Sequence, residues 1–192
     1  YGVFEVGMSK KGEVKSLSNL IQPHIGIITN IGEAHIENFK NIKGIAEAKG
    51  EIIDTIKKKG TIIINRDDKF YNYLQKKAQS KKLKIITFGI SQKSDIFPLK
   101  FVREKNFTKL SIQVMSEKID LVVKNINIYN VLASLAVLKE LNLSLRETQK
   151  IFKNFEPTEG RGKTHIISRY NKRFKLIDES YNANPLSVKN AI

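Results

Sequence analysis

The chain has 192 residues, 41% of them hydrophobic, and a formal net charge of +15 from 34 basic and 19 acidic residues. That length can bury one substantial core, or one domain with part of another. No apolar run reaches the roughly 18 residues that a membrane-spanning helix needs, and the absence of cysteine excludes disulfides and thiolate metal sites.

In the first half of the chain, segments typical of strands alternate with segments in which apolar residues recur at helical spacing. The expected elements, in chain order, are a strand at Val3–Val6, a helix at Val14–Ile21, a strand at Ile25–Thr29, a helix at Asn41–Lys58, a strand at Thr61–Ile64, a helix at Lys69–Ser80 and a strand at Lys84–Phe88. Pro23 would stop the first helix, and Gly60 would close the second as a left-handed C′ glycine. This alternation indicates an α/β fold with a doubly wound, mostly parallel sheet.

The pattern changes in the second half, where short strands follow one another without helices between them. The expected elements there are strands at Lys100–Val102, Leu110–Val114 and Ile119–Val123, helices at Ile128–Leu141 and Leu145–Phe155, and strands at His165–Ser168 and Phe174–Asp178. The three consecutive strands predict a small antiparallel patch. Proline, glycine and charge cluster in PTEGRGK at residues 157–163, so we expect one domain over 1–157 and the start of another over 158–192. The first residues resemble the inside of a strand and lack an initiator Met, so we expect a fragment of a longer protein.

One lysine lies where a helix should be apolar. Apolar residues mark one face of the expected second helix, namely Ile42, Ile45, Ala46, Ile52, Ile53 and Ile56. Lys49 falls at the centre of that face, and a buried ammonium is costly unless it finds a partner or loses its charge. A neutral amine can add carbon dioxide and become a carbamate, which is an anionic oxygen ligand. Alternatively, the side chain extends along the apolar surface to solvent.

Polar residues follow several of the expected strands, and ligands of open α/β sheets collect at the carboxyl ends of strands. The residues expected at that edge are Glu5, Asn30, His35, Asp67 and Asp68. Glu5, His35 and a carboxylated Lys49 would suit a divalent cation. A lone histidine beside a turn is more often a solvated or capping residue, so spacing alone leaves both interpretations open.

Two other patterns suggest functions that we weigh less. The net charge of +15 would suit nucleic acid, but 28 of the 34 basic residues are lysine and no aromatic residues are interleaved with them as a stacking platform. Gly162-Lys163-Thr164 imitates the end of a phosphate-binding P-loop, yet the loop's first glycine would be Pro157 and a strand-like segment follows. We therefore expect no P-loop there and no nucleic-acid partner, although a basic, non-catalytic binding module remains an alternative.

Several segments together resemble the Mur ligase family over nearly the whole chain. They are FEVGMSKKGEV (4–14), ITNIGEAHIENF (28–39), AEAKGEI (46–52), NIYNVLAS (127–134), GRGK (160–163) and IDESYNANP (177–185). The resemblance implies most of a P-loop-NTPase-like central domain, followed by the start of a Rossmann-like C-terminal domain. It also implies a cytoplasmic, ATP-dependent ligase of peptidoglycan precursor synthesis, which we expect to be a monomer.

Within the family, the EVGMSKKGEV and DESYNANP segments are most similar to the member that adds D-alanyl-D-alanine to UDP-N-acetylmuramoyl-tripeptide. Such a ligase phosphorylates the acceptor carboxylate with ATP, and the amine then attacks the acyl phosphate. A ligase of the same family that adds another amino acid, or adds glutamate to folate, is the alternative.

The resemblance also implies roles for single residues. Glu5 and His35 match ligands of a second Mg²⁺, and Lys49 matches a lysine that is a carbamate in several members. Lys49 and His35 would therefore take part in catalysis, together with an arginine at the nucleotide phosphates that Arg161 matches.

The remaining matches concern the nucleotide. Asn127 and Asn130 match asparagines on the adenine side, and Asp178 or Glu179 matches an acid near the ribose. Tyr181 matches the start of the signature that opens the C-terminal domain.

The chain also departs from the family pattern. The family's P-loop lies upstream of the position that matches Tyr1, and a Gly-x-His motif reads Lys124-Asn125-Ile126 here. We therefore expect no ligase activity from these 192 residues alone.

Overall fold

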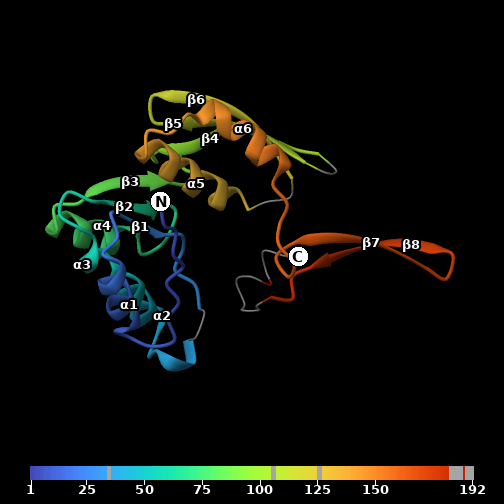
Figure 1. The fold of residues 1–192 in the computed structure, drawn as a ribbon. Helices are drawn as coiled ribbons and strands as arrows, with labels where there is room; N and C mark the ends of the chain where they lie inside the picture. Colours follow the sequence, from blue (N-terminus) through green and yellow to red (C-terminus); the bar gives the residue numbers. More distant parts are fainter. Residues whose placement is uncertain (34–35, 105–106, 125–126, 182–187, 189–192) are drawn as a thin grey trace.

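The computed structural model describes residues 1–33, 36–104, 107–124, 127–181 and 188 (Figure 1). Its elements are α1 (Glu13–Ile21), β1 (Ile25–Ile28), the 3-10 turn η1 (Ile36–Asn38), α2 (Ile42–Lys49), α3 (Ile52–Thr55), β2 (Thr61–Asn65), α4 (Tyr71–Ser80), β3 (Lys84–Phe88), β4 (Ile96–Arg103), β5 (Thr108–Val114), β6 (Glu117–Val123), α5 (Ile128–Glu140), α6 (Leu145–Asn154), β7 (Lys163–Arg169) and β8 (Lys172–Asp178). In this part of the chain no helix is both long and apolar enough to cross a membrane.

Six strands form one sheet in the order β1-β2-β3-β4-β5-β6. β1, β2 and β3 are parallel, and β3 meets β4 in parallel through the single pair Phe88–Ile96. β4, β5 and β6 then pair antiparallel as extended hairpins of the same sheet. The predicted α/β fold with a parallel sheet and an antiparallel patch is confirmed.

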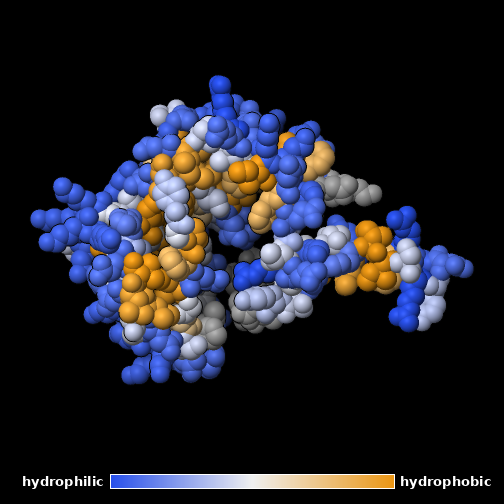
Figure 2. Space-filling view, viewed as in Figure 1, coloured by the Kyte–Doolittle hydropathy of each residue, from blue (hydrophilic) through white to orange (hydrophobic). Residues whose placement is uncertain are grey.

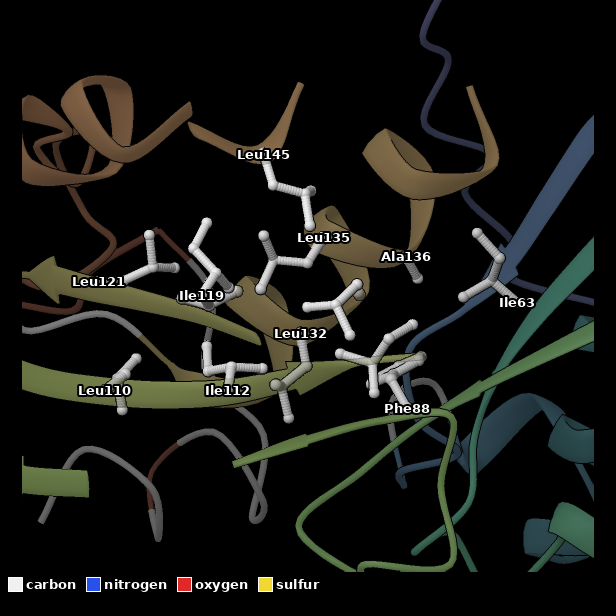
Figure 3. Packing of buried hydrophobic residues seen from close by; sticks show 14 of the residues in the cluster. Ile63, Phe88, Leu110, Ile112, Ile119, Leu121, Leu132, Leu135, Ala136 and Leu145 are labelled. Carbon is white, nitrogen blue, oxygen red and sulfur yellow. The ribbon is translucent and has the colours of Figure 1, made fainter. Parts of the chain in front are cut away.

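Helices cover both faces of the sheet because β2 is apolar on both of its sides. Ile62 and Ile64 pack into one core with residues of α2, α3 and α4. Ile63 points to the opposite face and packs into a second core with β3, the antiparallel strands and α5 (Figure 3). A strand whose residues are all buried is typical of a parallel sheet that is covered on both faces.

The β7–β8 hairpin forms a separate two-stranded sheet that projects away from the main sheet (Figure 1). Lys163 and Thr164 lie in β7, so the imitation of a P-loop is a strand, as predicted. Much of the hairpin is exposed, including Ile166 at 60% and Phe174 at 50%, and Figure 2 shows apolar surface on it.

The single helix predicted over Asn41–Lys58 is wrong, because the chain forms two helices there. α2 ends at Lys49, and Gly50 and Glu51 form a tight turn before the short α3. The Glu51 carboxylate is buried and accepts the backbone N–H groups of Gly12 and Lys15 at the start of α1. The helix is therefore interrupted where Glu51 contacts α1, and the helical spacing of the apolar residues does not predict this interruption.

The role predicted for Gly60 is also wrong. Lys59 takes the left-handed conformation, with φ of 63°, and α3 has already ended at Thr55. Gly60 is needed for close approach instead, since a Cβ there would lie 2.6 Å from the backbone oxygen of His24.

The strand predicted at Val3–Val6 does not form. These residues are irregular, with Val3 96% and Phe4 65% exposed, and the described edge strand β1 pairs only with β2. A short segment gains the hydrogen bonds of a strand only beside a partner strand. Glu5 consequently does not stand at the end of a strand.

Candidate active site

Lys49 reaches the carboxyl edge of the sheet from the last turn of α2. Its Nζ donates a hydrogen bond to the backbone oxygen of Asn30, just after β1, at 2.9 Å. Partial burial lowers the pKa of Lys49 below the ordinary lysine value, and the nearby charge of Asp68 acts in the opposite direction. Lys49 is therefore half-buried and has a polar partner at the edge where ligands are expected.

Asp68 fixes the loop after β1 to the loop after β2. Its Oδ2 accepts the N–H of Ile31 at 2.7 Å, and its Oδ1 accepts the N–H of Phe70 at 2.8 Å. Asn65 adds a second link, since its side-chain amide donates to the backbone oxygen of Thr29 at 3.1 Å. The prediction that polar residues gather at this edge is confirmed for Asn30 and Asp68.

Asp67 connects the loop after β2 with two further elements. Its carboxylate accepts the N–H of Ile90 at 2.5 Å, the N–H of Ser91 at 3.3 Å and the hydroxyl of Tyr129 at 3.2 Å. Gly89 makes this approach possible, because a Cβ at that position would lie 2.7 Å from Asp67 Oδ2. The carboxyl ends of β2 and β3 and the start of α5 therefore meet at one carboxylate.

The start of α5 carries both asparagines that the family resemblance assigns to the adenine side. Asn127 caps the helix, with its side-chain oxygen accepting the N–H of Tyr129 at 2.9 Å, and Asn130 is an exposed residue of the first turn. Burial raises the pKa of the Tyr129 hydroxyl, and the charge and hydrogen bond of Asp67 raise it further. Tyr129 therefore remains a protonated donor across the neutral pH range.

A second polar cluster forms at the base of the β7–β8 hairpin. The guanidinium of Arg161 lies 4.2 Å from the centre of the Tyr181 ring, which is cation–π geometry. Asp178 accepts the N–H groups of Gly160 at 2.9 Å and Ser180 at 3.0 Å. Hydrogen bonds from Ser180 and then from Gly160 hold the pKa of Asp178 below its ordinary value.

Backbone geometry brings these predicted residues together. Gly160 and Gly162 have φ of 76° and 86°, values that favour glycine, and Gly162 donates to the backbone oxygen of Asp178 at 2.7 Å. Glu179 approaches the same turn, since its Oε1 would lie 3.2 Å from a Cβ on Gly162. Arg161, Asp178, Glu179 and Tyr181 thus occupy one small region.

The predicted metal ligands are not brought together in the residues that the structure describes. Glu5 is exposed in the irregular first segment, and His35 lies outside the described residues, as does the signature Asn182–Pro185. Within the described ranges, no group of three His, Cys, Asp or Glu side chains could hold a metal ion. The metal site stays a prediction.

Sequence reasoning placed Asp67 at the correct edge of the sheet but gave Tyr129 and Glu51 no role. Tyr129 carries no local signal, because its partner lies 62 residues away. Glu51 carries no local signal either, because its partners Gly12 and Lys15 lie 39 and 36 residues away.

The chain matches known proteins over its whole length. Residues 1–138 match the family model of the Mur ligase middle domain. UDP-N-acetylmuramoyl-tripeptide–D-alanyl-D-alanine ligase of Buchnera aphidicola is 34% identical over 100% of this chain and 42% of the relative, and the Bacillus subtilis ligase of the same name is 30% identical over 99% and 40%.

The fold agrees with a solved structure. The crystal structure of MurF from Acinetobacter baumannii superposes with a TM-score of 0.86 at 28% identity, covering 98% of this chain and 41% of that one. The chain therefore spans about two fifths of the length of the relatives it matches. Together with the middle-domain match over 1–138, these similarities establish that the chain belongs to the Mur ligase family.

Proposed function

We propose that the protein containing this chain is an ATP-dependent ligase that joins D-alanyl-D-alanine to UDP-N-acetylmuramoyl-tripeptide. The observation that carries the proposal is the match of the entire chain to curated ligases of that name, at up to 34% identity. ATP transfers its terminal phosphoryl group to the tripeptide carboxylate, which gives an acyl phosphate and ADP. The amine of D-alanyl-D-alanine attacks the acyl carbon, the amide forms, and phosphate leaves.

The nucleotide would bind between the start of α5 and the base of the hairpin. Asn127 and Asn130, which are both exposed at the start of α5, would contact adenine. Arg161 would present its planar donor fork to the phosphates. Of the two acids at the hairpin base, Glu179 is the better ribose ligand, because both oxygens of Asp178 already accept backbone N–H groups.

Lys49 would serve as a metal ligand in carbamate form, together with Glu5 and His35. Its amine adds carbon dioxide with release of one proton, and this step requires the neutral amine that partial burial favours. The carboxylate and the carbamate oxygen are ligands that Mg²⁺ prefers, whereas the imidazole suits this ion less well. When bound, Mg²⁺ supplies neutralisation of the charge on the transferring phosphoryl group.

We assign residues 1–157 to the central domain and residues 158–192 to the start of the C-terminal domain. The separate β7–β8 sheet supports this division. The substrates belong to the cytoplasmic stage of peptidoglycan synthesis, so we place the enzyme in the cytoplasm, as a monomer. Light scattering of the complete protein would show a dimer if the monomer assignment is wrong.

The test is phosphate release by the complete protein, because the chain covers only part of its relatives. We expect release of phosphate only when ATP, the UDP-linked tripeptide and D-alanyl-D-alanine are all present. Phosphate release that does not depend on the dipeptide, or depends on free glutamate instead, would overturn the proposal. The 192-residue chain alone is expected to release none.

The carbamate has a separate test. Carbon-13 NMR with labelled bicarbonate should show a carbamate resonance in the complete protein, and Lys49→Ala should remove it. A spectrum that is unchanged by Lys49→Ala would refute the assignment. Lys43→Ala provides the control, since Lys43 lies on the exposed side of the same helix.

A further inference from the structure

The hydrogen bond between Tyr129 and Asp67 joins two elements that are distant in the chain. Tyr129 lies in the first turn of α5, and Asp67 follows β2 at the carboxyl edge of the sheet. The tyrosine hydroxyl donates to Asp67 Oδ2 at 3.2 Å across a separation of 62 residues. The contact therefore fixes where the start of α5 lies relative to the strand ends.

Asp67 is held in place independently of Tyr129. Its carboxylate accepts the N–H groups of Ile90 and Ser91 from the loop after β3, and its own N–H donates to Asn65 Oδ1 at 2.9 Å. Gly89 leaves the space that the carboxylate needs. These hydrogen bonds hold the Asp67 carboxylate in one position, so Asp67 can serve as a fixed anchor.

Tyr129 connects the fixed Asp67 carboxylate to the first turn of α5. Its ring packs against the core beneath the helix, and its backbone N–H donates to Asn127 Oδ1 at 2.9 Å. One unbroken series of contacts therefore runs from the strand ends through Asp67 and Tyr129 to the side chain of Asn127. The first turn of a helix needs such support, because its N–H groups lack partners within the helix.

We propose that Asp67 is a positioning residue for nucleotide binding, which acts through Tyr129 on the orientation of Asn127 and Asn130. The inference rests on the proposed function, which assigns adenine to these asparagines. An amide side chain can accept from the exocyclic amine of adenine and donate to a ring nitrogen, a pairing that guanine does not match. Correct placement of the amides therefore supports both affinity and the preference for adenine.

The experiment compares Tyr129→Phe, Asp67→Ala and the double variant in the complete protein. Calorimetry measures the Kd for ATP and GTP, and steady-state kinetics separates the KM for ATP from kcat. Tyr73→Phe is the matched control, because Tyr73 is a partly buried tyrosine on α4 at the opposite core. Thermal unfolding of each variant shows whether the fold is preserved.

We expect Tyr129→Phe to raise the Kd for ATP about three- to tenfold, since it removes a hydrogen bond to a charged acceptor. The preference for ATP over GTP should fall. The kcat at saturating ATP should change less than about twofold, because the lost contact stabilises the bound substrate and the transition state equally. In the Asp67→Ala background, which lacks the acceptor, Tyr129→Phe should have little further effect. Tyr73→Phe should leave all of these quantities unchanged.

An unchanged Kd and an unchanged preference for ATP in Tyr129→Phe would overturn the inference. So would an effect of equal size with and without Asp67→Ala, because the hydroxyl would then act without Asp67. If Asp67→Ala fails to fold, the comparison of Tyr129→Phe with Tyr73→Phe still decides. Failure of the unmodified protein to bind ATP would instead contradict the proposed function.

Discussion

Removing the Glu51 carboxylate should destabilise the fold strongly, although Glu51 lies in a turn. The side chain is 7% exposed and accepts the N–H of Gly12 at 2.8 and 3.1 Å and the N–H of Lys15 at 3.1 Å. These two N–H groups are at the start of α1, where a helix provides no internal acceptor. Glu51 therefore caps α1 from a distant part of the chain.

The magnitude follows from what Glu51→Ala leaves behind. Loss of a helix cap costs about 0.5–2 kcal/mol, and hydrogen bonds to a charged group contribute about 1.5–3 kcal/mol. Because the two estimates describe overlapping contacts, we expect a loss of about 2–4 kcal/mol of unfolding free energy, not their full sum. Glu51→Gln keeps the shape and one acceptor oxygen, so we expect roughly half that loss.

Urea unfolding of the chain measures this loss as a shift of the midpoint at constant m-value. Glu47→Gln is the matched control, because Glu47 lies one turn earlier, its side chain is 37% exposed, and it pairs with Lys11 at 3.3 Å. Surface ion pairs are worth about 0–1 kcal/mol. A Glu51→Ala variant no less stable than Glu47→Gln would refute the assignment of Glu51 as a cap.

Three further predictions concern the core, a buried charge and the hairpin base. Phe88 is fully buried, so Phe88→Ala should lower the free energy of unfolding, measured in urea, by about 3–5 kcal/mol. Phe101 is 56% exposed, so Phe101→Ala should lower it far less. Equal losses would contradict the core assignment. Lys49→Met should stabilise the chain at neutral pH and abolish ligation by the complete protein. At a pH between the lowered pKa of Lys49 and 10.5, this lysine binds fewer protons in the folded chain than in the unfolded chain. The stability of the wild-type chain should therefore rise with pH in that window. Thermal unfolding of Lys49→Met should lack this rise. Tyr181→Leu should raise the KM for ATP in the complete protein by removing the ring beneath Arg161, and Tyr181→Phe should not; equal effects would show that the ring contact is irrelevant.

The spacing of apolar and capping residues predicted those elements whose bounds are set by residues within or next to the element itself. β3 has the bounds that its apolar run indicated, and α5 begins after Asn127 because that side chain caps it. Predictions failed where a distant contact decides the structure. The apolar spacing of residues 42–56 continues through Gly50 and Glu51, but the helix breaks there, where Glu51 contacts α1.

The candidate site could be predicted only in part for the same reason. Strand alternation and the position of the polar turns placed Asn30 and Asp68 at one edge of the sheet, and the structure confirms it. The partners of Asp67 come from a loop and a helix far along the chain, and no local pattern encodes such pairing. Family resemblance named Arg161 and Tyr181, whereas their stacking is visible only in three dimensions.

The most direct measurement is a competition among amine substrates in one reaction. The complete protein would receive ATP, Mg²⁺ and UDP-N-acetylmuramoyl-tripeptide with equal amounts of D-alanyl-D-alanine, D-glutamate, L-lysine and meso-diaminopimelate, and mass spectrometry would identify the products. We predict that the D-alanyl-D-alanine adduct dominates, and that it disappears when ATP is omitted. Dominance of any single amino acid adduct would contradict the proposed function.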